Sequence, residues 1–153
     1  MAHIHKTIVV PAPPAAIRGM VLDPERWAEW YVGLSAPTKL EGGGEPGTYS
    51  EHTYQLAGHG YPIHHTVSEV EDDGSSIRWK GTIEGSFRGW HEWSYRPVAG
   101  GTEVTVDHHY ELPGRMLGRI VDAVVVERLI ARNLEASLDT LRVFGESAHA
   151  EAA

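Results

Sequence analysis

The stretch PGRMLGRIVDAVVVERLIARNLEASLDTLRVFGE, from Pro113 to Glu146, decides how the rest of the chain must fold. Its apolar residues recur at steps of three and four, which is the pattern of one long amphipathic helix. A helix of about thirty residues would be roughly 45 Å long, and this one carries too many charges to cross a membrane. The apolar stripe comprises Leu117, Ile120, Val121, Val124, Val125, Leu129, Ile130, Leu134, Leu138, Leu141 and Phe144. Such a stripe predicts a broad apolar surface that covers it.

The composition is typical of one globular domain, which we expect to span residues 1–153. Hydrophobic residues make up 41% of the chain and charged residues 22%, and there is no cysteine, which excludes disulfides and thiolate zinc sites. Met1 to Lys6 lacks the pattern of a signal peptide, so we expect a cytoplasmic protein. The net charge of -8, with dispersed Lys and Arg, argues against nucleic acid or an anionic membrane as partner. We expect a monomer or a homodimer.

A strand, two short helices and an antiparallel meander are predicted before the long helix. His3 to Val10 is rich in β-branched residues and predicts a strand. A first short helix is expected over Pro14 to Val21. Asp23-Pro24-Glu25 supplies an N-cap and a proline for a second one. From Gly47 onward, turn signals divide the chain into strands of about ten residues, which gives about six to seven strands in all.

Alternation of side chains assigns the faces of these strands. A tight turn at Gly100-Gly101 would place Trp93 opposite His108, with Thr105, Asp107 and His109 facing outward. The same reasoning across the earlier turns places Trp79 opposite Trp93, His65 opposite Trp79, and Tyr54 beside His65. The predicted inner row is therefore Tyr54, His65, Trp79, Trp93 and His108. Such a row describes the wall of a ligand pocket as well as a core.

Three parts of the chain resemble a known superfamily. The first strand and helix pair of the START/Bet v 1-like (SRPBCC) superfamily is similar to Ile8-Val9-Val10-Pro11-Ala12-Pro13 followed by Leu22-Asp23-Pro24-Glu25-Arg26-Trp27-Ala28-Glu29-Trp30. Its last hairpin resembles Trp93-Ser94-Tyr95-Arg96-Pro97 with Gly100-Gly101-Thr102-Glu103-Val104, and its closing helix resembles Asn133-Leu134-Glu135-Ala136-Ser137-Leu138. Within the superfamily, the polyketide cyclase/dehydrase-like branch is the most similar. The resemblance implies an α+β helix-grip fold, in which a curved antiparallel sheet wraps around the C-terminal helix.

The resemblance also implies a cavity between sheet and helix that holds a hydrophobic small molecule, polyketide-like or lipid-like. Aromatase and cyclase members are described as steering a poly-ketone chain with a cavity arginine and hydroxyl groups. Here the expected strand from Tyr61 to Val70 has no arginine, and Arg78, Arg88 and Arg96 fall on the outward parity. Ligand binding is therefore the leading hypothesis, and a cyclase, dehydrase or aromatase is the alternative.

The expected cavity would measure several hundred Å³. Its predicted lining is Trp30, Tyr54, His65, Trp79, Ile83, His91, Trp93, His108, Tyr110, Val121, Val125 and Leu129. Among these, His91, His108 and Tyr110 are the candidate acid/base residues for an enolisable carbonyl compound. Buried histidines that only hydrogen-bond within a core are the competing interpretation. Of Trp27 and Trp30, one is expected in the core and the other at the cavity mouth.

No metal or cofactor is predicted. His91 and His108 could approach one another, but a third ligand is not evident because Glu92, Asp107 and His109 point the other way. The absence of cysteine and of a glycine-flanked serine elbow gives no support for a nucleophile. Gly42-Gly43-Gly44 lacks the lysine of a phosphate-binding loop.

A non-enzymatic partner-binding domain is the third class of function considered. It would expose contiguous apolar surface on the outer sheet or the outer helix. The residues expected on the outer helix face are charged, which disfavours this class: Asp122, Glu127, Arg128, Arg132, Glu135 and Asp139.

Overall fold

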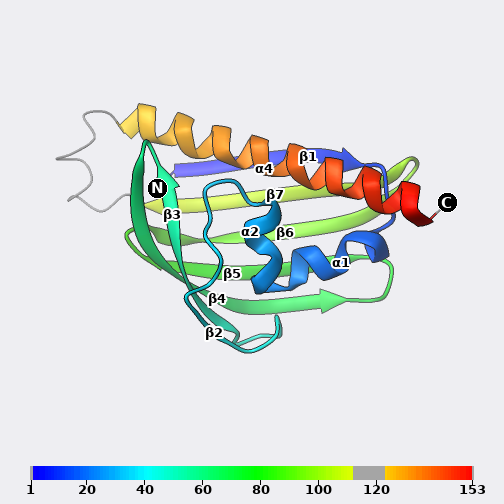
Figure 1. The fold of residues 1–153 in the computed structure, drawn as a ribbon, viewed down its shortest axis with the longest axis horizontal. Coiled ribbons are helices and arrows are strands. Elements are labelled where there is room, and N and C mark those ends of the chain that lie inside the picture. The colour runs from blue at the N-terminus through cyan, green and yellow to red at the C-terminus, as the bar shows by residue number, and fades with distance from the viewer. Residues whose placement is uncertain (1, 112–122, 153) are drawn as a thin grey trace.

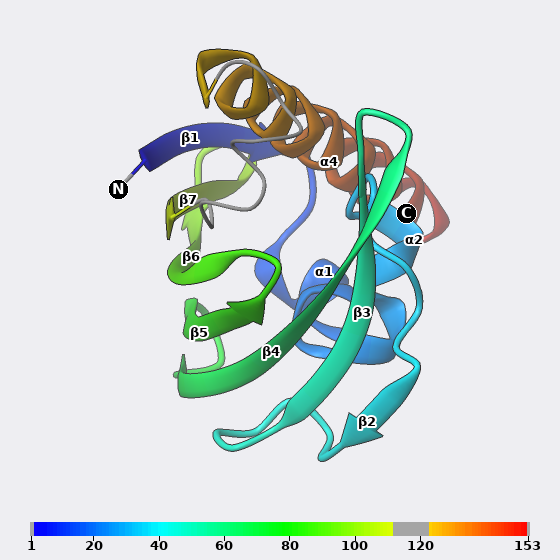
Figure 2. The ribbon, with the colours of Figure 1, turned by 90° about the vertical axis from the view of Figure 1, so that its left-hand side faces the viewer.

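A computed structural model describes residues 2–111 and 123–152 (Figure 1). The elements in chain order are β1 (Ala2–Val10), α1 (Pro14–Leu22), the 3-10 helix η1 (Pro24–Arg26), α2 (Trp27–Trp30), β2 (Lys39–Glu41), β3 (Tyr49–Leu56), β4 (His59–Asp72), β5 (Ile77–Gly85), β6 (Arg88–Val98), β7 (Gly101–Glu111) and α4 (Ala123–Ala152). Within the described residues, seven strands form one antiparallel sheet in the order β1-β7-β6-β5-β4-β3-β2. Figure 2 shows this sheet curving around α1 and α2, with α4 running along its open side. The predicted helix-grip fold is confirmed.

The two short helices begin where the sequence predicts. Pro14 occupies the start of α1, and the Asp23 side chain accepts a hydrogen bond from the Glu25 backbone N–H at 3.0 Å. The indole N–H groups of Trp27 and Trp30 donate to backbone carbonyls of α1 at 3.0 and 3.1 Å. Both rings are buried, so neither remains at an open mouth. These bonds attach α2 to α1 and aim both tryptophans at the sheet.

The long helix packs on the sheet through one stripe. Its buried apolar residues are Val126, Ile130, Leu134, Leu138 and Leu141. The predicted inward position of Val125 is wrong, because its side chain is 46% exposed. The stripe follows steps of four from Val126 to Leu138 and a step of three to Leu141. Val125 lies about 100° away from Val126 around the helix. Val121 and the rest of the predicted helix before Ala123 lie outside the described residues.

The pairing of β5 with β6 is as predicted, with Trp79 opposite Trp93. The β6–β7 pairing differs by two residues: Trp93 lies opposite Val106, and His108 lies opposite His91. The cause is the turn, because Val98 pairs with Gly101 and the tight turn falls on Ala99-Gly100 instead of Gly100-Gly101. A shift of two residues keeps every side chain on its predicted face.

Two other predicted pairings are wrong for the same reason. His65 lies opposite Ile83, not Trp79, because the β4–β5 turn comes later, where Asp73 Oδ1 accepts backbone N–H bonds from Ser75 and Ser76. A register irregularity between Val67 and Glu69 reduces this shift by one residue, so that His65 pairs with Ile83 and not with Glu84. Tyr54 lies opposite Tyr61, not beside His65, because the β3–β4 turn is at Ala57-Gly58. His65 and Tyr54 nevertheless stay on the buried face.

Candidate functional site

A cavity of about 70 Å³ lies between the sheet and the helices. Nine of the twelve predicted lining residues surround it: Trp30, Tyr54, His65, Trp79, Ile83, His91, Trp93, His108 and Tyr110. Of the others, Val125 is exposed, Leu129 packs against the core without lining the cavity, and Val121 lies outside the described residues. The remaining lining residues are Trp27, Tyr31, Leu34, His52, Ile63, Phe87 and Ile130.

The cavity is much smaller than the expected several hundred Å³, because aromatic rings fill most of the space. The ring of Trp27 stacks on Trp79 with centroids 5.3 Å apart, and Trp79 stacks on Trp93 at 6.2 Å. Trp30 meets Trp93 edge to face at 5.5 Å. Sequence reasoning assigned one of the α2 tryptophans to the mouth, and their three-residue spacing alone did not reveal that both enter the cavity wall.

Three histidines lie side by side on the cavity wall, on β4, β6 and β7. The Nε2 atoms of His65 and His91 are 2.7 Å apart, and the rings of His91 and His108 have centroids 5.7 Å apart. Between His65 and His91 runs β5, which contributes Gly81 at this point. A Cβ atom at Gly81 would collide with the His65 ring and lie 2.9 Å from His91 Nε2. The missing side chain of Gly81 therefore lets the two rings meet across a strand.

The hydrogen bonds fix the tautomers of this pair. The indole N–H of Trp93 donates to His91 Nδ1 at 3.0 Å, so a neutral His91 carries its proton on Nε2 and donates it to His65 Nε2. A neutral His65 then carries its proton on Nδ1. Both nitrogens of His91 are occupied, which removes it as a free acid/base group.

Burial keeps all three imidazoles uncharged at neutral pH. Desolvation is the largest cause, and it lowers the pKa of His65 to about 3 and that of His108 to about 4. The pKa of His91 is also well below its usual value, from desolvation and then from its neighbours His65 and His108. Desolvation raises the pKa of Tyr110, so its hydroxyl stays protonated.

Three buried polar atoms at the cavity have no hydrogen-bond partner among the residues that the structure describes. They are His65 Nδ1, His108 Nδ1 and Tyr110 Oη. By contrast, Tyr54 Oη accepts a bond from Asn133 at 3.0 Å, and Tyr95 Oη accepts one from Trp79 at 3.3 Å. Leaving a buried polar group unsatisfied costs about 1–3 kcal/mol. The three atoms therefore mark where a bound molecule would gain hydrogen bonds.

A cluster of possible metal ligands lies outside the cavity. Over residues 2–111 and 123–152, a single group of three His, Cys, Asp or Glu residues has the spacing for a metal ion, and it comprises His3, Asp107 and His109. It lies on the outer face of the sheet, away from the cavity histidines.

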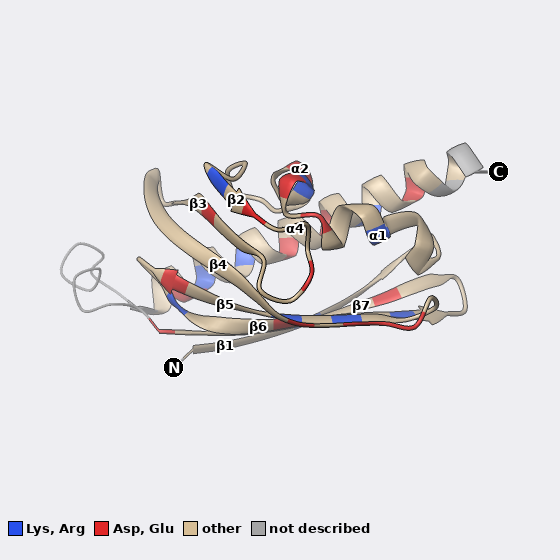
Figure 3. Ribbon diagram, turned by 90° about the horizontal axis from the view of Figure 1, so that it is seen from below, with Lys and Arg blue, Asp and Glu red and all other residues tan. Residues whose placement is uncertain are grey.

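In the part of the chain that is described, Lys and Arg are spread over several helices and strands (Figure 3). Among the described helices, none has the length and hydropathy needed to cross a membrane.

Comparison with known proteins gives a family and a fold. Residues 1–143 match the family model described as polyketide cyclase/dehydrase and lipid transport. No curated protein sequence matches the chain significantly. Among solved structures, the Zhui aromatase/cyclase of Streptomyces sp. R1128 superposes with a TM-score of 0.74 at 15% identity, covering 95% of this chain and 93% of that one. TTHA0849 of Thermus thermophilus gives 0.68 at 22% identity, covering 96% and 99%. Ara h 8.0201 gives 0.68 at 14%, covering 95% and 98%. At these identities the structural likeness shows the fold alone.

Proposed function

Since the chain belongs to the polyketide cyclase/dehydrase and lipid transport family, we propose that it binds a small apolar or aromatic molecule between the sheet and α4. The unpartnered polar atoms at the cavity carry this proposal. An apolar wall that contains His65 Nδ1, His108 Nδ1 and Tyr110 Oη suits a ring that bears one or two oxygen atoms. A tautomer with hydrogen on His65 Nδ1 would donate to a carbonyl or phenolic oxygen.

The size of the cavity sets the class of ligand. A cavity of about 70 Å³ is smaller than the ~150 Å³ apolar cavity that accepts benzene in an engineered protein. Even one ring therefore requires a lining side chain to shift, and a polyketide-like or lipid-like molecule requires more. Trp27 is the side chain to displace, because it comes from the four-residue helix α2 and stacks on Trp79 from the helix side. We expect compact ligands to bind better than multi-ring ones.

Native mass spectrometry of the freshly purified protein, followed by extraction, tests whether a small molecule is retained. The change in melting temperature with phenol, 2-naphthol and a hydroxylated anthraquinone then shows how large a ligand the cavity accepts. Ile130→Trp should abolish both signals, because Ile130 lines the cavity and is 4% exposed. Val125→Trp is the matched control on the exposed side of the same helix. Binding that survives Ile130→Trp, or an absence of any retained mass or shift, would overturn the proposal.

Acid/base catalysis in the same cavity is the second candidate. It is favoured by one observation: His108 and Tyr110, with ring centroids 5.6 Å apart, both keep an unpartnered polar atom. A neutral imidazole beside a protonated phenol could remove an α-proton while the hydroxyl donates to the carbonyl oxygen.

Proton exchange on a simple ketone tests this candidate without knowledge of the natural substrate. Acetophenone in D2O should lose its methyl proton signal at least about 100-fold faster with the protein than in buffer. His108→Gln and Tyr110→Phe should each return the rate to the buffer value while thermal shift by phenol persists. Exchange at the buffer rate with the unsubstituted protein would exclude this candidate but leave the binding proposal standing.

A further inference from the structure

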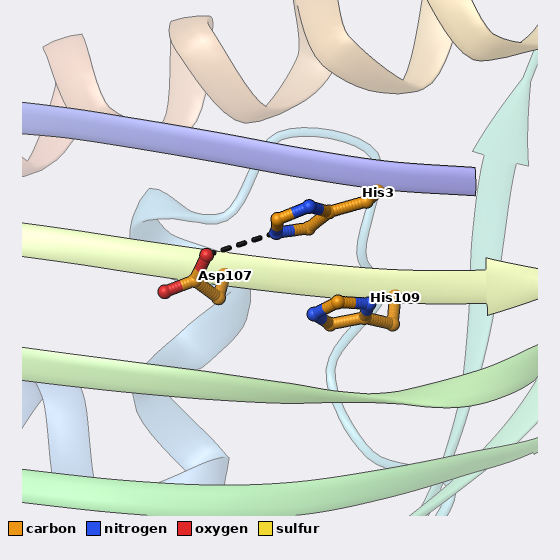
Figure 4. Close-up of side chains that lie close together, drawn as sticks. All are labelled: His3, Asp107 and His109. Atoms are coloured by element: carbon orange, nitrogen blue, oxygen red, sulfur yellow. Dashed lines mark hydrogen bonds and ion pairs between the residues drawn. The ribbon is translucent and has the colours of Figure 1, made fainter. Parts of the chain in front are cut away.

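Four polar side chains gather on the outer face of the sheet. His3 and His5 extend from β1, and Asp107 and His109 from β7. The register sets His3 directly opposite His109 and His5 directly opposite Asp107. Side chains of such cross-strand pairs start with Cβ atoms about 4.5–5.5 Å apart. The backbone pairing of the first and last strands therefore holds these groups together, and Figure 4 shows three of them.

Specific contacts fix the cluster. Asp107 Oδ1 lies 2.9 Å from His3 Nε2 and 2.8 Å from His5 Nδ1. Since an ionised carboxylate only accepts, both imidazoles donate. The ring of His109 is stacked between those of His3 and Trp90, with centroids 4.0 Å from each. The stack and the two hydrogen bonds place two imidazoles and one carboxylate around a common space that opens to solvent.

The donor set and its spacing are those of a metal site. One ligand atom from each of His3, Asp107 and His109 lies within 4.8 Å of the other two. Two histidines and a carboxylate, with an open position for water, are a common zinc ligand set. We propose that these three residues bind a divalent transition-metal ion, Zn²⁺ first among them. His5 is a positioning residue, whose hydrogen bond orients the Asp107 carboxylate, as outer-shell partners do at metal sites.

Metal binding requires a local rearrangement of the ligand side chains. Metal–ligand distances of about 2.0–2.1 Å in a tetrahedral site place ligand atoms roughly 3.3 Å apart, so the 2.9 Å contact of His3 with Asp107 widens slightly. His3 must also present a lone pair on Nε2. Its proton moves to Nδ1 through solvent. The side chain is 49% exposed, which allows this exchange and lets the ring turn from its parallel stack toward the ion.

Isothermal titration of the tag-free, metal-stripped full chain with ZnCl2 tests the site. We expect one Zn²⁺ per chain. His3→Ala, Asp107→Asn and His109→Ala should each weaken binding by at least about 100-fold, and His5→Ala by about tenfold. His64→Ala is the matched control, because His64 is an exposed histidine on a strand of the same sheet and contacts none of these residues.

A second readout separates a built site from loose surface binding. Co²⁺ in a tetrahedral or five-coordinate site should give strong visible absorption in the unsubstituted protein and in His64→Ala, and lose it in His109→Ala. Circular dichroism and the melting temperature check that each variant is folded. The proposal is wrong if Zn²⁺ does not bind, if a folded His3→Ala/His109→Ala double variant binds with unchanged affinity, or if His64→Ala weakens binding equally.

Discussion

Gly81 is the residue on which the arrangement of the cavity histidines depends. Any side chain there would occupy the space in which His65 and His91 meet, and His91 would be pushed from Trp93. We predict that Gly81→Ala lowers the free energy of unfolding by about 1–3 kcal/mol, the usual cost of overpacking a filled core. Urea denaturation monitored by tryptophan fluorescence measures this change.

Gly19→Ala is the same substitution at a position where we expect it to raise stability instead of lowering it. Gly19 is exposed within α1, and a Cβ atom there would meet only Arg26 Nη1 at an ordinary 3.5 Å. Alanine is favoured over glycine inside a helix by about 0.5–1 kcal/mol, so this variant should be more stable than the original. Equal effects of Gly81→Ala and Gly19→Ala would contradict the special role of Gly81.

The sequence predicted, residue by residue, on which face of the sheet a side chain lies. It did not predict which side chains are in contact. The alternation in β7 correctly assigned His108 inward and Asp107 and His109 outward. The contact between His65 and His91 depends on registers that shift with each turn, and on a glycine in the strand between them. The alternation of side chains is a local property, whereas this contact requires two turns to be placed correctly.

The helix α4 packs on the sheet through one buried stripe, and its other side is exposed to solvent. Leu138 is 4% exposed, and Leu138→Ala should cost about 2–5 kcal/mol through lost burial and a residual cavity. Val125→Trp should change stability by less than about 0.5 kcal/mol, because Val125 is 46% exposed. Thermal and urea denaturation of both variants measure the contrast. A large loss in Val125→Trp would show that the helix is rotated from the position described.

The same helix is attached to the loop after α2 by one serine. Ser137 Oγ accepts the Val32 backbone N–H at 2.8 Å and donates to the Asn133 carbonyl at 2.7 Å. Ser137 is fully buried, so Ser137→Ala leaves the Val32 N–H without its partner and should cost about 1–3 kcal/mol. Ser147→Ala, at an exposed position of α4, is the control and should be neutral or slightly stabilising. Hydrogen exchange at the Val32 amide should quicken only in Ser137→Ala, and an unchanged rate there would argue against this attachment.

Element types were predictable because composition and periodicity are local properties. The proline and aspartate signals placed α1 and η1, and the apolar stripe predicted the long helix. Turn positions were less predictable, because several adjacent residues in each connection are of types that suit a tight turn. Ala57 adopts a positive φ of 52° beside Gly58, and nothing in its residue type favours that over a turn at His59-Gly60.

At the scale of the whole molecule, the sheet separates two sets of histidines. His65, His91 and His108 face the helices, whereas His3 and His109 lie on the outer face. The outer cluster could not be found by considering the last hairpin alone, because it forms only when β1 pairs with β7. The alternating histidines at positions 3 and 5, together with the strand order of the helix-grip fold, contained that information.

The inner histidines make the stability of the whole protein depend on pH. In the unfolded chain a histidine takes up a proton near pH 6.5, whereas in the folded protein burial holds the pKa of His65 at about 3 and that of His108 at about 4. The pKa of His91 is lowered in the same direction. Below pH 6.5 the unfolded state therefore binds more protons than the folded state. Stability is fully present above that pH and is lost as the pH falls toward 4.

Between pH 6 and pH 5 each of these residues should remove roughly 1 kcal/mol, about 3 kcal/mol for the three. That is a large part of the 5–15 kcal/mol typical of a domain, so we expect acid unfolding to begin near pH 5. Urea denaturation at pH 7.5, 6.0 and 5.0 measures the slope. His108→Gln should reduce it by about a third because one titrating ring is gone, and His64→Gln, at an exposed position, should leave it unchanged. The same slope in His108→Gln as in the unsubstituted protein would mean that His108 is already charged in the folded state, and the acid/base role considered for it would lose its neutral imidazole.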